Sequence, residues 1–114
     1  MTITFTTHVL NGTDGTHAGG VALRLCAGDA VLAQGVTDQG GRLRCEIAVD
    51  ALPADGAVAL HIETAAYWRD RSVPRQGPQI VEGVTIRLSL PPGAAHHHVP
   101  IMLSPNAFSA WWSA

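Results

Sequence analysis

The sequence has no lysine and few charged residues of any kind. Charged side chains make up 14% of its 114 residues, against roughly 25% in an ordinary soluble domain. All seven basic residues are arginine, and nine acidic residues leave a formal net charge of −2. A chain without a basic surface is not a nucleic-acid binder. The small number of charges indicates instead that part of the surface faces other subunits.

Long apolar runs and paired cysteines are also missing. No apolar stretch approaches the roughly 18 residues that a membrane helix needs, and the N-terminus has neither the basic segment nor the cleavage site of an export signal. Cys26 and Cys45 have no CxxC spacing, so we expect reduced thiols in packing positions. These absences predict a cytoplasmic protein without a membrane span. The length predicts a single domain over residues 1–114.

Helix-forming runs are scarce, whereas apolar and polar residues alternate with period two along the whole chain. Without helices between the strands, a parallel sheet of βαβ units is excluded, and the alternation predicts an all-β protein, an antiparallel β-sandwich. The expected helix is Thr64–Arg71, with Thr64 as its candidate N-cap. The expected strands are Ile3–Leu10, Val21–Cys26, Val31–Val36, Arg42–Val49, 58–63, Thr85–Leu90, His96–Leu103 and Ala107–Trp112.

Three adjacent histidines, His96, His97 and His98, are the most conspicuous polar feature. On a strand, alternate side chains share a face, so His96 and His98 point together and His97 points away. Two imidazoles on one face suit a metal site or acid–base chemistry near neutral pH, and they are equally typical of a polar surface stripe. Zinc would need a third ligand, and none lies nearby at ligand spacing. The three residues alone leave these alternatives open.

Two other side chains are candidates on weaker grounds. His8 lies in an otherwise apolar and threonine-rich strand, and Arg42 begins a strand after a double-glycine turn. A single histidine in such a strand is more often structural, and an arginine at a strand start is more often solvated. No GxSxG motif, P-loop or dinucleotide-binding fingerprint is present. Taken singly, these residues do not decide a function.

Taken together, three motifs resemble one family. Thr7–Gly20 (THVLNGTDGTHAGG), Val36–Arg42 (VTDQGGR) and His96–Pro105 (HHHVPIMLSP) resemble, in order and spacing, the signatures of the 5-hydroxyisourate hydrolases. The usual forms in this transthyretin-related family are THVLD…G.PA, TD.DGR and HYHVPLLLSP. Tyr67-Trp68 also matches an aromatic pair that the family carries. The resemblance extends from about Phe5 to the C-terminus.

The resemblance implies a prealbumin-like sandwich of two four-stranded sheets with one short helix. It implies a homotetramer, built as a dimer of dimers, with active sites at the dimer–dimer interface. The implied reaction of urate and purine catabolism needs no metal and no cofactor. Water attacks the C6 carbonyl of 5-hydroxyisourate and the N1–C6 bond opens, giving 2-oxo-4-hydroxy-4-carboxy-5-ureidoimidazoline. His8, Arg42 and His98 are the implied catalytic residues, with Arg42 also binding the substrate, whereas His97 replaces an aromatic residue and is not expected to take part.

The C-terminus departs from the family pattern. The family usually ends in YRGS, whereas this chain ends in WWSA, residues 111–114. Trp111 replaces the tyrosine and is a candidate substrate-binding residue, and Ser113 is a candidate hydroxyl one position early. The tryptophans would suit an N-methylated hydroxyisourate, and a non-catalytic transthyretin-like protein that binds a small ligand is a further alternative. His8 and His98 argue against the latter. Earlier in the chain, His17 stands where proline is usual.

Overall fold

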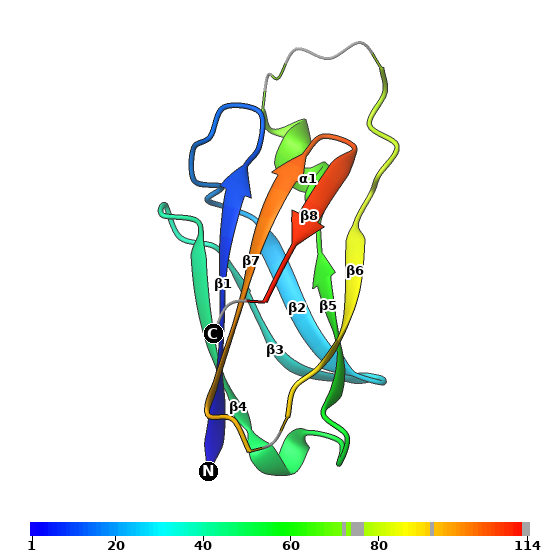
Figure 1. Cartoon of the computed structure of the whole chain (residues 1–114). Coiled ribbons are helices and arrows are strands. Elements are labelled where there is room, and N and C mark those ends of the chain that lie inside the picture. The colour runs from blue at the N-terminus through cyan, green and yellow to red at the C-terminus, as the bar shows by residue number, and fades with distance from the viewer. Residues whose placement is uncertain (72, 74–76, 92, 113–114) are drawn as a thin grey trace.

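The computed structural model describes residues 1–71, 73, 77–91 and 93–112. These residues form two four-stranded sheets packed face to face, in the orders β4-β1-β7-β8 and β3-β2-β5-β6 (Figure 1). This confirms the predicted sandwich. A short helix, α1 (Thr64–Arg69), follows β5, and a single 3-10 turn, η1 (Val49–Ala51), follows β4. The strands are β1 (Thr2–Asn11), β2 (Ala22–Ala27), β3 (Ala30–Val36), β4 (Arg42–Ala48), β5 (Ala57–Ile62), β6 (Val84–Ser89), β7 (His96–Ser104) and β8 (Ala107–Ala110).

Strand β1 shows how the alternating sequence produces the sandwich. Ile3, Phe5 and Val9 are buried between the sheets, and the side chains between them are partly exposed on the outer face. Strand β7 alternates in the same way at its start, because His97 is buried and His98 is half-buried. The predicted separation of His97 from its two neighbours is therefore confirmed.

The direction of one strand pair was not predicted. Within the described chain the pairs are antiparallel except for β1 and β7, which run parallel. These two strands come from opposite ends of the chain, and all four strands of the other sheet lie between them in sequence. Alternation with period two is the same in both directions, so the sequence pattern carries no information about this pairing.

Helix α1 begins at Thr64 as predicted and ends two residues early, at Arg69. Thr64 is not its N-cap, which is a correction to the prediction. Glu63 occupies that position without a side-chain hydrogen bond, and the buried Thr64 hydroxyl donates to the carbonyl of Val81 at 3.5 Å. Trp68 is fully buried and anchors the helix to the core.

Strand β8 is also shorter than predicted. Its pairing with β7 ends at Ala110, opposite Ile101, although the backbone N–H of Trp111 still donates to the Pro100 carbonyl at 3.2 Å. Cys26 and Cys45 are both free, as expected. No helix among the described residues is long and apolar enough to cross a membrane.

Candidate active site

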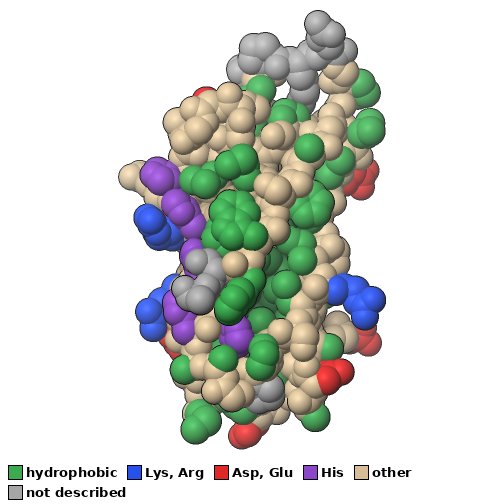
Figure 2. Space-filling model, viewed as in Figure 1, with side chains coloured by type: hydrophobic (Ala, Val, Ile, Leu, Met, Phe, Trp, Pro, Cys, Tyr) green, Lys and Arg blue, Asp and Glu red, His purple; other side chains and the backbone are tan. Residues whose placement is uncertain are grey.

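Strand β1 lies between β4 and β7, so side chains from three strands meet on the outer face of this sheet. The register places His8 opposite Arg42 of β4 and Thr6 opposite His98 of β7. Paired residues in a sheet point to the same face. The fold therefore brings His8, Arg42 and His98, the three predicted catalytic residues, to one face. Figure 2 shows histidine and arginine side chains gathered along one side of the molecule.

The hydroxyl of Thr6 holds two of the histidines. Its Oγ1 lies 2.8 Å from Nε2 of His96 and 2.8 Å from Nδ1 of His98. A hydroxyl has one proton, so it donates to one ring and accepts from the other. Because Nδ1 of His98 is engaged in this way, Nε2 is the nitrogen that His98 offers to a ligand.

A pocket of about 530 Å³ opens on this face. The charged side chains of this pocket are more positive than negative, because two guanidinium groups face one carboxylate. Guanidinium groups bind planar oxyanions through paired hydrogen bonds, so the pocket suits a small, polar, anionic ring. Its polar lining comes from Thr6, Asp38, Arg42, Arg44, His96 and His98.

The turn before β4 places Arg42 at the pocket. The Asp38 carboxylate oxygen Oδ1 accepts hydrogen bonds from the backbone N–H groups of Gly40 and Arg42, both at 2.9 Å. Gly41 has a φ of 75°, and a Cβ atom there would lie 2.3 Å from the carbonyl oxygen of Val9. Only glycine fits this position without strain. The double glycine of the sequence is thus what allows the chain to turn tightly against β1.

The two arginines of the pocket differ in their partners. Arg44 pairs with Glu46 at 2.9 Å, whereas no ion pair involving Arg42 occurs in the described part of the chain. The guanidinium of Arg42 is exposed, and it is the one whose charge no carboxylate already neutralises. Of the two, Arg42 is the better placed to bind an anionic ligand.

His8 is held in its neutral form. Partial burial is the largest cause that lowers the pKa of His8, followed by the positive charge of Arg42 and the neighbouring His17, with His98 a smaller contribution. A backbone hydrogen bond with Gly40 acts in the opposite direction. A histidine with a lowered pKa is unprotonated at neutral pH and is ready to accept a proton.

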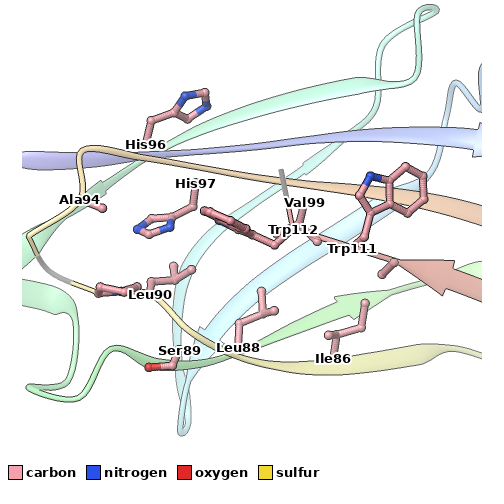
Figure 3. A pocket seen from close by; sticks show the side chains of 12 residues that line it. Ile86, Leu88, Ser89, Leu90, Ala94, His96, His97, Val99, Trp111 and Trp112 are labelled. Carbon is pink, nitrogen blue, oxygen red and sulfur yellow. The ribbon is translucent and has the colours of Figure 1, made fainter. Parts of the chain in front are cut away.

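Trp111 does not line the pocket that contains Arg42 and His98. It is 46% exposed, and together with Trp112 it lines a second pocket of about 560 Å³ between the two sheets (Figure 3). This pocket is mostly apolar, with Leu88 and Val99 on its walls and His97 at one end. Within one chain the structure therefore does not bring Trp111 to the pocket of Arg42 and His98. Ser113, the candidate hydroxyl, lies outside the described residues.

Three polar side chains at this face were not singled out from the sequence as functional. Thr6 precedes His8 by two residues, so the alternation of β1 could have identified it. Asp38 lies in the predicted turn before Arg42, and this position next to a candidate site residue could have identified it. His17, whose Nδ1 lies 2.9 Å from Nε2 of His8, comes from a turn-rich loop where no periodic pattern predicts a direction.

The arrangement suits proton transfer beside an anion-binding group. Neutral imidazoles can accept and return a proton, and an unpaired guanidinium can stabilise negative charge on an oxygen. Among the described residues, no group of three or more His, Cys, Asp or Glu side chains is placed to hold a metal ion. The face is therefore equipped for acid–base chemistry on a small polar ring.

Comparison with known proteins agrees with this geometry. The profile of the HIUase/Transthyretin family matches residues 5–112. The chain is 29% identical to the 5-hydroxyisourate hydrolase of Deinococcus radiodurans over 110 residues, covering 93% of this chain and 92% of the relative. It is 31% identical to 5-hydroxyisourate hydrolase 2 of Rhizobium meliloti over 110 residues, with coverage of 93% and 92%.

Solved structures give the same result. The 5-hydroxyisourate hydrolase of Klebsiella pneumoniae superposes with a TM-score of 0.77 at 28% identity, covering 98% of this chain and 99% of that one. Transthyretin from Sparus aurata superposes with a TM-score of 0.74 at 27% identity, covering 96% and 95%. The expected prealbumin-like fold is thus confirmed, and the chain belongs to the HIUase/Transthyretin family.

Proposed function

We propose that this protein hydrolyses 5-hydroxyisourate to 2-oxo-4-hydroxy-4-carboxy-5-ureidoimidazoline. The observation that carries the proposal is the meeting of His8, Arg42 and His98 at one face of one sheet. The relatives named 5-hydroxyisourate hydrolase support it, because they match this chain over nearly its whole length. The reaction belongs to the degradation of urate.

The proposed mechanism uses the two imidazoles for protons and the guanidinium for charge. A water oxygen attacks the C6 carbonyl while one proton of the water passes to the imidazole of either His8 or His98. The carbonyl oxygen becomes an oxyanion, which Arg42 stabilises. The C6–N1 bond then breaks, its electron pair stays on N1, and the proton returns from the imidazole to that nitrogen. N1, which already carries one hydrogen, becomes an NH2 group, and the former C6 becomes a carboxylic acid that releases its remaining proton to solvent as a carboxylate.

A ligand carrier is the alternative from another functional class. A sea bream transthyretin structure with 27% identity contains thyroxine, so the fold also serves as a binding protein. The neutral His8 and the unpaired Arg42 favour the enzyme. The test is turnover: catalytic amounts of the protein should accelerate the loss of absorbance of freshly made 5-hydroxyisourate, whereas a carrier would bind it without consuming it.

An N-methylated ring gains no support from the position of the tryptophans. Trp111 and Trp112 line the apolar pocket between the sheets, so within one chain neither faces the pocket of His98. A role for Trp111 in substrate binding would have to come through a neighbouring subunit. The unmethylated ring is therefore the substrate that we propose.

We further propose that the chain forms a homotetramer, a dimer of dimers. Strands β6 and β8 are the edges of the two sheets on the same side of the sandwich (Figure 1), and the apolar pocket opens between them. Exposed edge strands with apolar surroundings favour pairing with another chain. The exposed Phe108, Trp111 and Trp112 lie in or next to β8 and add to this surface.

A charge placed at this edge should break the assembly. Trp112→Glu puts a carboxylate on a side chain that is 68% exposed in the single chain, and burying it in an interface without a partner is unfavourable. We expect light scattering after size exclusion to show a shift from four chains toward smaller species. Val31→Glu is the matched control, because Val31 is 51% exposed on β3 at the opposite edge. A tetramer unchanged by Trp112→Glu would contradict the proposed interface.

A further inference from the structure

We propose that His17 is a positioning residue for His8, and that the two imidazoles act in the reaction as one hydrogen-bonded pair. The inference rests on the proposed hydrolysis and concerns the same site. It starts from one contact: Nε2 of His8 lies 2.9 Å from Nδ1 of His17. The ring centroids are 4.9 Å apart and the rings are inclined by 30°.

The backbone explains how a loop residue reaches a strand residue. Leu10 and His17 form an isolated antiparallel bridge. Its hydrogen bonds run from the N–H of Asn11 to the carbonyl of Thr16 at 2.8 Å, and from the N–H of Ala18 to the carbonyl of Val9 at 2.9 Å. Leu10 and His17 are thus a pair without hydrogen bonds of their own, the arrangement in which facing side chains come closest.

The alternation of β1 then directs the His17 ring to His8. Leu10 and His8 are two residues apart, so both point to the outer face. His17, opposite Leu10, points to that face as well and is a diagonal neighbour of His8, within reach of a ring. The side chain of His17 is exposed and makes no backbone contact that holds the bridge. Its replacement should therefore leave the loop in place.

Two imidazole nitrogens at this distance form a hydrogen bond, with one proton between them. In the neutral pair one nitrogen donates and the other accepts, which fixes the tautomers and the orientation of both rings. Positive charge on the His17 ring disfavours the protonated form of the adjacent His8 ring. His17 is accordingly one of the causes that lower the pKa of His8.

Two other side chains around His8 act in the same direction as His17, and one backbone group opposes them. Arg42 from β4 and His98 from β7 also lower the pKa of His8, and the backbone of Gly40 in the turn raises it. The Asp38 carboxylate of the same turn accepts hydrogen bonds from backbone N–H groups. Among the groups that lower the pKa of His8, His17 is the one with a hydrogen bond to a His8 nitrogen, at 2.9 Å.

The test compares His17→Ala with the wild-type protein over a range of pH. Without His17 the His8 ring loses its partner, and we expect a fall of about tenfold in kcat with little change in KM, since His17 does not line the pocket. The pKa of His8 should rise, because one cause that lowers it is gone. A base works only when unprotonated, so the acid limb of the kcat/KM profile should move to higher pH.

Two further variants separate positioning from a general structural effect. His17→Asn keeps a side-chain amide that can donate to His8 but cannot titrate, so it should restore most of the rate and keep the shifted acid limb. His61→Ala is the matched control, because His61 lies in the other sheet and pairs with Thr85 at 2.9 Å. It should leave both the rate and the profile as they are. A His17→Ala protein with the wild-type rate and profile would overturn the inference.

An NMR titration tests the pair without any substrate. In the wild-type protein the His8 ring signals should follow two coupled steps, and in His17→Ala a single step at higher pH. The same curve in both proteins would overturn the pairing. A wild-type protein that shows the coupled steps but consumes no 5-hydroxyisourate would refute the proposed function and leave the pair standing, so the two failures are distinguishable.

Discussion

His98→Asn is expected to lower kcat/KM for 5-hydroxyisourate by about a thousandfold, within the range that a positioned acid–base group contributes. Asparagine can keep the hydrogen bond to the Thr6 hydroxyl, which lies 2.8 Å from Nδ1 of His98. It cannot accept a proton from water at the position of Nε2. The measurement is the initial rate of absorbance loss of freshly made 5-hydroxyisourate, with a melting curve to show that the variant is folded.

His96→Asn is the control for this prediction. His96 lies on the same face and contacts the same Thr6 hydroxyl at 2.8 Å, but it is more exposed than His98. The proposed mechanism assigns His96 no role in proton transfer. We expect it to lose far less activity than His98→Asn. Equal losses in both variants would contradict a specific role for His98 and indicate that the histidine face acts through its overall charge or shape.

Arg42→Ala is expected to have the second-largest effect, a loss of roughly a hundredfold to a thousandfold in kcat, as when one group that stabilises an oxyanion is removed. KM should rise as well, because the same guanidinium binds the anionic ring before the reaction. Steady-state kinetics on freshly made substrate separate the two contributions. Arg42→Lys should recover only part of the rate, because an ammonium group cannot form the paired hydrogen bonds of a guanidinium.

Arg44→Ala provides the comparison. Both arginines line the pocket, but Arg44 already pairs with Glu46 at 2.9 Å. Its removal should cost much less activity than the removal of Arg42. If Arg44→Ala were the more damaging of the two, the assignment of the oxyanion to Arg42 would be wrong.

Much of the fold follows from period-two alternation, which predicts strands where the structure has them, although β8 ends two residues earlier than predicted. Alternation also predicted that His96 and His98 share one face and that His97 points to the other, and the structure shows that this other face is the interior, where His97 is 5% exposed. The same pattern could not show that β1 and β7 are parallel neighbours, because the number of residues between them does not determine which strands pair. The prediction that His8 and His98 belong to one site therefore rested on the family resemblance alone.

The rest of the candidate site depends on loops and chain ends, where no period applies. His17 reaches His8 through a single bridge with Leu10, and the spacing of nine residues gives no sign of it. Trp111 follows β8 and lies against the space between the sheets, although its place in the tail motif suggested the substrate pocket. The direction of such side chains is set by tertiary packing rather than by local pattern.

The proposed assembly through the β6–β8 edge would account for the small number of charged residues in the sequence. In the proposed tetramer other chains cover the β6–β8 edge, and the lining of the pocket between these two strands is mostly apolar, although Arg87 of β6 is exposed. The polar side chains of the outer face, by contrast, are concentrated at the proposed active site. The proposed β6–β8 contact and the proposed active site lie at different pockets of the sandwich, and His96 lines both.

The most direct measurement of the central claim follows freshly generated 5-hydroxyisourate with a catalytic amount of the wild-type protein and with the same amount of His98→Asn, with the product identified by NMR. We predict that the wild-type protein consumes many equivalents far faster than buffer alone and yields the ring-opened product. With the variant, the substrate should decay at close to the spontaneous rate. Spontaneous decay with both proteins, or equal acceleration by both, would contradict it.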